Sequence, residues 1–92
     1  MALLSEDEIN QHLARSQWER EDDQIFREWK FENFAEAMVF VNRVAEAAEE
    51  VNHHPDILVH GWNRVRLSVT NHAEGGLTQA DFSLAGMIDG LA

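Results

Sequence analysis

The sequence predicts an α+β fold in which three helices cover one face of a four-stranded antiparallel sheet, in the order α-β-β-α-β-β-α. Three observations support this prediction: one long segment with apolar residues at helical spacing, two shorter segments that open with capping patterns, and four segments with strand character. The chain has 92 residues, a length that corresponds to one domain, residues 1–92.

The clearest helix lies between Asn33 and Pro55. Asn33 followed by Glu36 indicates its start, and Pro55 indicates its end, because the residue before a proline disfavours helical backbone angles. Its apolar stripe follows the i, i+3, i+4, i+7 series and consists of Ala37, Phe40, Val41, Val44, Ala45 and Ala48. Three apolar residues off this stripe predict a second contact surface: Phe34, Met38 and Val39.

The two shorter helices begin with capping-box patterns. Ser5 and Glu8 open the first helix, which we expect over residues 6–16. Thr78 and Asp81 open the last helix, with Asp in place of the usual Glu. Strands are expected at residues 18–20, 25–31, 57–62 and 65–70. The last two strands form a hairpin through residues 61–64.

Composition excludes several classes of protein. The net charge is −10 with only seven Lys and Arg residues, so binding to a nucleic-acid backbone is not expected, and the acid excess indicates a solvated surface. The chain has no cysteine, hence no disulfide or thiolate chemistry. The first residues show no basic region followed by an apolar run, and no apolar stretch approaches the ~20 residues that span a bilayer. We therefore expect a cytoplasmic protein without a membrane partner.

His53 and His54 are the first candidates for chemistry. They lie at the C-terminal end of the long helix, where the negative end of the helix dipole favours the imidazolium form. Glu49 stands four residues before His53 and would favour that form further, whereas burial would oppose it. An imidazole that titrates near neutral pH suits a general acid or base. The simpler alternative is that adjacent histidines only cap helix carbonyls.

The remaining histidines differ in what they predict. His72 follows the fourth strand in a glycine-rich loop, from which its side chain could reach across a cleft. His12 has no evident partner and His60 lies in a strand, so both are assigned to surface or structural roles. Asp81 has a simple structural role as the third residue of the last helix.

A metal site is an alternative use of the same residues. His53, His54 and His72 could combine with Glu49 or Asp81 as a ligand set. However, neighbouring residues at a helix end point in different directions, and established spacings such as H-E-x-x-H are absent. We therefore expect no metal.

Three motifs together resemble the pterin-4a-carbinolamine dehydratase family. They are E-x-x-N-H-H-P at residues 49–55, W-N-R-V at residues 62–65, and T-N-H-A-E-G-G-L-T-x-x-D at residues 70–81. Each motif alone is weak, but the histidine pair before proline is specific in combination with a third histidine before a Gly-Leu-Thr loop. The resemblance covers nearly the whole chain and implies the fold order stated above.

The resemblance also implies a function. The family removes water from 4a-hydroxytetrahydropterin to give quinonoid dihydropterin, by histidine acid–base catalysis without a cofactor. The positions that match its catalytic histidines are His53, His54 and His72, and Glu49, His54 and Asp81 match positions that bind the pterin. We expect His53 and His72 to act as the acid–base groups, His54 to hold the pterin, and Glu49 to orient His53 or anchor the pterin's amino-amide edge. All three imidazoles should then meet in one pocket.

The sequence departs from the family pattern in three places. Asn52 stands where members often have Asp, which removes a charge near His53. Asp56 and Ile57 follow the proline where animal members often have a tryptophan shortly after it, and the hairpin is one residue longer around Gly61. These changes predict a different pH optimum or rate and an altered pocket wall.

The resemblance implies partners as well. Family members are homodimers or homotetramers, joined by sheet edges and by packing of the long helix. Some animal members also bind a homeodomain transcription factor as dimerisation partners. A protein-binding module without catalysis is therefore the alternative function, and Phe34, Met38 and Val39 are its expected contact surface.

Overall fold

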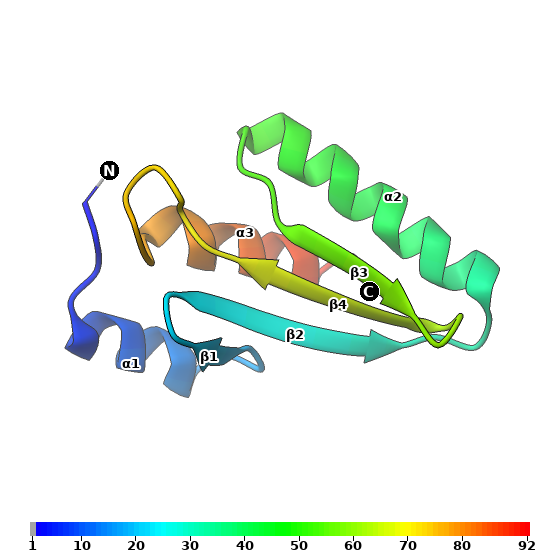
Figure 1. Ribbon diagram of the computed structural model, residues 1–92, viewed down its shortest axis with the longest axis horizontal. Coiled ribbons are helices and arrows are strands. Elements are labelled where there is room, and N and C mark those ends of the chain that lie inside the picture. The colour runs from blue at the N-terminus through cyan, green and yellow to red at the C-terminus, as the bar shows by residue number, and fades with distance from the viewer. Residues whose placement is uncertain (1) are drawn as a thin grey trace.

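The computed structural model describes residues 2–92 and has the predicted order of elements (Figure 1). The helices are α1 (Glu6–Ala14), α2 (Phe34–Val51) and α3 (Gln79–Asp89). The strands are β1 (Glu19–Glu21), β2 (Gln24–Lys30), β3 (Asp56–His60) and β4 (Arg64–Val69). All strand pairs are antiparallel, and the order across the sheet is β1-β2-β4-β3. The predicted α+β class and its four-stranded sheet are confirmed.

The hydrophobic core lies between one face of the sheet and the helices. Alternate residues of β2 and β4 face the helices, and the register places Ile25 opposite Val69 and Trp29 opposite Val65. Helices α2 and α3 contact each other over this face, and α1 joins them where His12 stacks on Phe82 with ring centroids 4.5 Å apart. The helical residues buried in the core cluster are Ile9, Ala37, Phe40, Val44, Phe82, Leu84, Ala85 and Ile88. No helix within residues 2–92 is long and apolar enough to span a membrane.

Helix α1 and strand β3 each end two residues before the predicted position, and the other strand ends are shifted by one residue. Helix α1 stops at Ala14, two residues early, because the Arg15 and Ser16 amides bond to the carbonyls three residues back. Strand β3 ends at His60 rather than at residue 62, because Gly61 and Trp62 adopt left-handed backbone angles with φ of 56° and 57°. The hairpin at residues 61–64 is present, but Trp62 belongs to its turn.

The two ends of α2 are both capped by asparagine. At the start, Asn33 Oδ1 accepts a hydrogen bond of 2.8 Å from the Glu36 amide, as predicted. At the other end, Asn52 takes a left-handed conformation with φ of 52°, and its amide bonds to the Glu49 carbonyl while the His53 amide bonds to the Ala48 carbonyl. These two bonds form a Schellman motif, which ends the helix at Val51, before the chain reaches Pro55. The end of α2 is therefore set by Asn52 and not by the proline.

Candidate functional site

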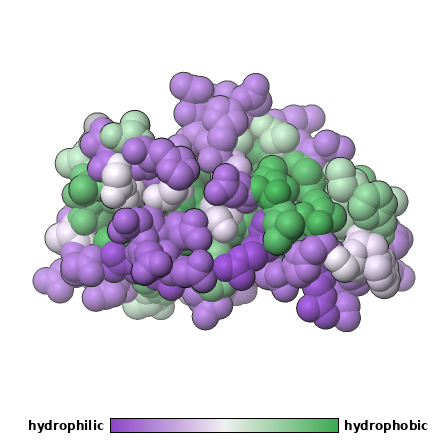
Figure 2. All heavy atoms as spheres, viewed as in Figure 1, coloured by the Kyte–Doolittle hydropathy of each residue, from purple (hydrophilic) through white to green (hydrophobic). Residues whose placement is uncertain are grey.

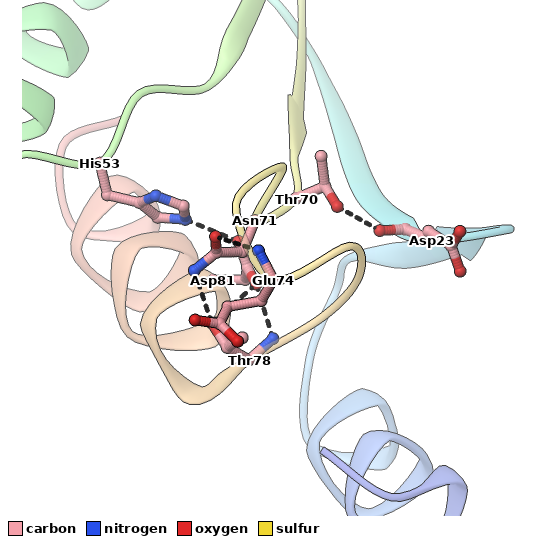
Figure 3. A network of polar contacts seen from close by, with 7 residues as sticks. All are labelled: Asp23, His53, Thr70, Asn71, Glu74, Thr78 and Asp81. Atoms are coloured by element: carbon pink, nitrogen blue, oxygen red, sulfur yellow. Dashed lines mark hydrogen bonds and ion pairs between the residues drawn. The ribbon is translucent and has the colours of Figure 1, made fainter. Parts of the chain in front are cut away.

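Helix α2 delivers His53 to the start of α3. The left-handed turn at Asn52 directs the chain away from the helix axis, and His53 Nε2 comes within 2.6 Å of Asp81 Oδ1 (Figure 3). The side chain of Asp81 is 0% exposed and that of His53 is 16% exposed. The two residues are 28 positions apart in sequence, so this pair is made by the packing of α2 against α3.

The carboxylate of Asp81 is held from its other oxygen. Asp81 Oδ2 accepts hydrogen bonds from the Thr78 amide at 2.7 Å and from the Thr78 hydroxyl at 3.1 Å (Figure 3). The predicted role of Asp81 in capping α3 is thus present, and the same side chain also contacts His53. A carboxylate held by donors acts only as an acceptor, so His53 Nε2 carries the proton in the contact with Asp81. His53 Nδ1 has no hydrogen bond within residues 2–92 and is the nitrogen left for another partner.

Glu49 contacts His54 and not His53. His54 Nε2 lies 2.5 Å from Glu49 Oε2, and both side chains are more than half exposed. The expected pairing of Glu49 with His53 is therefore wrong. The physical reason is the left-handed Asn52, since it breaks the helical spacing on which that expectation depended.

His72 lies in the loop between β4 and α3, which is organised by Asn71. The Asn71 carbonyl accepts hydrogen bonds from the amides of Glu74, Gly75 and Gly76. Thr70, just before it, donates a hydrogen bond from its hydroxyl to the Asp23 carbonyl, which joins the loop to the turn between β1 and β2 (Figure 3). His72 is exposed and lines a cavity of about 330 Å³ between this loop and that turn.

The lining of this cavity includes neither His53 nor His54. The structure thus brings His53 to Asp81 and His54 to Glu49, and it places His72 separately on the adjoining loop. The convergence of the three imidazoles on one ligand stays a prediction.

The other two histidines have partners that the sequence did not indicate. His12 stacks on Phe82 with an interplanar angle of 13°. His60 Nε2 lies 2.8 Å from Glu28 Oε1, across the open face of the sheet. The assignment of both to structural roles fits these contacts, but the expectation that His12 has no partner is wrong.

No three His, Asp or Glu side chains within residues 2–92 converge in a way that could hold a metal ion. The alternative ligand set of three histidines with Glu49 or Asp81 is therefore not assembled. Instead, Asp81 and Glu49 each contact a single imidazole, that of His53 and that of His54 respectively.

Comparisons of the sequence with known proteins all point to one family. The sequence profile described as Pterin 4 alpha carbinolamine dehydratase matches residues 2–91. A protein from Thermomicrobium roseum, provisionally named a pterin-4-alpha-carbinolamine dehydratase, is 53% identical to this chain over 75 residues. The match covers 82% of this chain and 80% of that protein. A similarly named protein from Chloroflexus aggregans is 50% identical over 91 residues, covering 97% of this chain and 96% of that protein.

A solved structure agrees in fold and sequence. The crystal structure from Brucella melitensis described as a transcriptional coactivator/pterin dehydratase matches with a TM-score of 0.91 at 32% identity, covering 98% of both chains. As its three motifs predict, the chain belongs to the pterin 4 alpha carbinolamine dehydratase family.

Proposed function

We propose that the protein is a dehydratase that removes water from a 4a-hydroxytetrahydropterin to give a quinonoid dihydropterin. Membership of the family supports the reaction class. The observation that carries the mechanism is the partly buried hydrogen bond between Asp81 and His53.

The reaction needs two proton transfers and no redox step. The hydroxyl leaves as water when an acid protonates its oxygen, and a base takes the proton from the neighbouring ring nitrogen. A positioned acid or base contributes roughly 10²–10⁴-fold to such a step. Imidazole suits both roles, because it exchanges protons near neutral pH.

In this proposal His53 acts through Nδ1. Asp81 accepts a hydrogen bond from Nε2–H, which fixes the tautomer and leaves the Nδ1 lone pair free to take a proton. When His53 becomes an imidazolium, the carboxylate of Asp81 beside it stabilises the positive charge without moving. Asp81 is then a positioning residue: it orients His53, and His53 contacts the pterin.

His72 is the second acid–base group of the proposal and approaches the ring from the loop side. His54 and Glu49 bind the pterin as a pair, since they contact each other at the exposed end of α2. The carboxylate of Glu49 suits the N–H donors of the pterin's amino-amide edge. Closure of the loop at residues 70–76 towards α2 would be needed to bring His72 to the ring.

Dehydration kinetics with purified protein test the proposal. Replacing His53 or His72 by Ala should lower turnover by about two decades or more, in keeping with the loss of a general acid or base. His60→Ala is the matched control, because His60 also pairs with a carboxylate but lies on the open face of the sheet. Wild-type turnover in both His53→Ala and His72→Ala would reject the mechanism.

We also propose a homodimer or homotetramer. Figure 2 shows apolar side chains gathered over β3, where Ile57 and Leu58 are exposed. Strand β3 is at the edge of the sheet within residues 2–92, and an exposed apolar edge favours pairing with another chain. Leu58→Arg should shift the sedimentation coefficient towards that of a monomer, whereas Leu3→Arg, at an exposed leucine away from β3, should not.

Protein binding is a second candidate function. Phe34 and Val39 on α2 are 53% and 49% exposed, which leaves an apolar surface on the helix. The similar structure from Brucella melitensis is itself described as a coactivator as well as a dehydratase. A partner retained by the triple variant of His53, His54 and His72, and lost in Phe34→Ser with Val39→Ser, would support this function.

A further inference from the structure

A cleft of about 640 Å³ lies at the tip of the β3–β4 hairpin. It is formed by the turn around Trp62 and by the end of β2 at Lys30. Strand β4 runs from Arg64 at this cleft to Val69 at the loop that carries His72, so the cleft and the candidate active site are at opposite ends of the sheet (Figure 1). The cleft is therefore separate from the residues of the proposed dehydration.

Trp62 is exposed at this cleft and has unfavourable backbone angles. Its side chain is 62% exposed, whereas Trp18 is buried in the core. Gly61 and Trp62 both have left-handed angles, the geometry of a tight hairpin turn that normally takes Gly, Asn or Asp. A bulky residue with positive φ is uncommon, and such residues gather at ligand sites. The stability of the fold does not account for a tryptophan here.

The turn that carries Trp62 is rigidly attached to β2. Asn63 is 6% exposed, and its side-chain amide donates a hydrogen bond of 2.9 Å to the Phe31 carbonyl. The Phe31 amide donates in return to the Asn63 carbonyl at 2.7 Å. The backbone at Trp62 is thus fixed by the hydrogen bonds of the neighbouring Asn63, so Trp62 is exposed on an ordered turn.

Two cations line the same cleft as Trp62. Lys30 and Arg64 are directly opposite each other in the β2–β4 register, and both are exposed. Neither forms an ion pair within residues 2–92, although Arg20, Arg27 and Arg66 all have carboxylate partners. Like charges opposite each other destabilise a sheet, and in a chain of net charge −10 they could easily have been neutralised. Lys30 and Arg64 therefore place at the cleft two positive charges without an ion-pair partner among the described residues.

We propose that the cleft binds a planar heteroaromatic ring that carries a phosphate monoester, the chemistry of a nucleoside monophosphate. The ring stacks on Trp62, as bases stack on exposed aromatic side chains. Arg64 and Lys30 bind the phosphate, because guanidinium and ammonium groups match its two negative charges and its acceptor oxygens. Glu32 at the same cleft accepts hydrogen bonds from N–H groups on the ring.

Calorimetric titration with guanosine monophosphate (GMP) tests this site on the intact chain. GMP should bind at one site per chain, and guanosine or inorganic phosphate alone should bind at least tenfold more weakly, since each makes only part of the contacts. The Trp62 indole N–H resonance should shift with GMP, and those of Trp18 and Trp29 should not. Phosphate that binds as tightly as GMP would overturn the proposal, because the site would then hold an adventitious ion only.

Variants locate the site and separate binding from folding. Trp62→Gly removes the ring and suits the left-handed turn, so it should melt at the wild-type temperature or above while GMP binding is lost. Trp62→Phe should keep binding within a few fold. Arg64→Gln and Lys30→Gln should each weaken GMP about tenfold, whereas Arg43→Gln, at an exposed cation on α2, should not. GMP affinity unchanged in Trp62→Gly, or equal losses in all three cation variants, would overturn the proposal.

Discussion

Asp81 serves two purposes with its two carboxylate oxygens. Oδ2 accepts a hydrogen bond from the Thr78 amide at the start of α3, and Oδ1 accepts a hydrogen bond from the Nε2–H of His53. The first contact is a local helix cap that holds the second oxygen in place. A residue that caps a helix is therefore well suited to position an imidazole, because its own geometry is already determined by the backbone.

Asp81→Asn tests this role by changing the tautomer of His53. An amide that donates to Nε2 would leave the proton on Nδ1, the atom that must accept a proton in the mechanism. We expect turnover to fall by about two decades or more with a smaller change in KM. Asp81→Asn should add little to His53→Ala, because Asp81 acts through His53. Asp89→Asn, on the same helix, is the control, and wild-type turnover in Asp81→Asn would contradict the role.

The tautomer itself can be observed without an activity assay. Nitrogen-15 NMR of the neutral imidazoles should show the His53 proton on Nε2, since Asp81 Oδ1 lies 2.6 Å from that atom. The Asp81→Asn variant should lose this preference. A His53 ring with its proton on Nδ1 in the wild-type protein would show that Asp81 does not set the tautomer.

At the scale of single elements, the last turn of α2 decides where the histidines go. The left-handed Asn52 closes the helix and sends His53 towards α3, while His54 stays beside Glu49. Asn suits this position, because it tolerates left-handed angles better than most residues. The residue at position 52 thus acts through backbone conformation.

Substitutions at Asn52 should separate conformation from side-chain chemistry. Asn52→Ala should lower the free energy of unfolding by about 1 kcal/mol, because a Cβ without a compensating polar group disfavours positive φ. Asn52→Gly should be as stable as wild type or more so. Urea denaturation measures both, and Asn42→Ala, within the same helix, is the control. Equal stability of the Ala and Gly variants would contradict the explanation.

The hydrogen bonds in the first turn of α1 predict that the free energy of unfolding depends on pH. The Ser5 amide, and then the Ser5 hydroxyl, lower the pKa of Glu8 below its ordinary value of 4.5. A carboxyl group whose pKa is lowered by folding contributes stability above its unfolded value, and this contribution is lost as pH falls through the folded value. Glu8→Gln keeps the capping pattern but does not titrate, so its free energy of unfolding should fall less steeply below pH 4.5.

Urea denaturation at a series of pH values measures this slope. Asp7→Asn is the matched control, since Asp7 lies in the same acidic first turn but makes no hydrogen bond through its side chain within residues 2–92. A Glu8→Gln variant with the wild-type slope would show that the cap does not favour the ionised form of Glu8.

At the scale of the whole molecule, the charge of −10 acts against compactness. Seventeen acidic residues face seven Lys and Arg residues, so the folded chain repels itself at low ionic strength. Raising NaCl from about 10 mM to 200 mM shortens the Debye length from roughly 30 Å to below 10 Å. We expect this salt increase to relieve about 0.5 kcal/mol of repulsion, and thermal unfolding should then show a rise in Tm of roughly 2–4 °C for a domain of this size. A Tm that falls with salt would show that the surface ion pairs outweigh the repulsion.

The sequence by itself determined the order of elements, the caps at the helix starts and most of the strand ends to within one residue. These features depend on contacts within a few residues, such as Asn33 with Glu36, and on apolar periodicity, which responds to burial wherever it occurs. The boundaries that differ most, at Ala14, Val51 and His60, depend on turns whose backbone angles residue type indicates only weakly.

Only the tertiary structure decided which carboxylate belongs to which histidine. The sequence spacing favoured Glu49 with His53, but the left-handed Asn52 cancels that spacing and the packing of α2 on α3 brings in Asp81 from 28 residues away. The position of Trp62 in one cleft with Lys30 and Arg64 likewise depends on the register of two strands and on one turn with left-handed backbone angles. Such contacts join residues that are distant along the chain, so no local pattern encodes them, and they exist only once the sheet and helices have packed together.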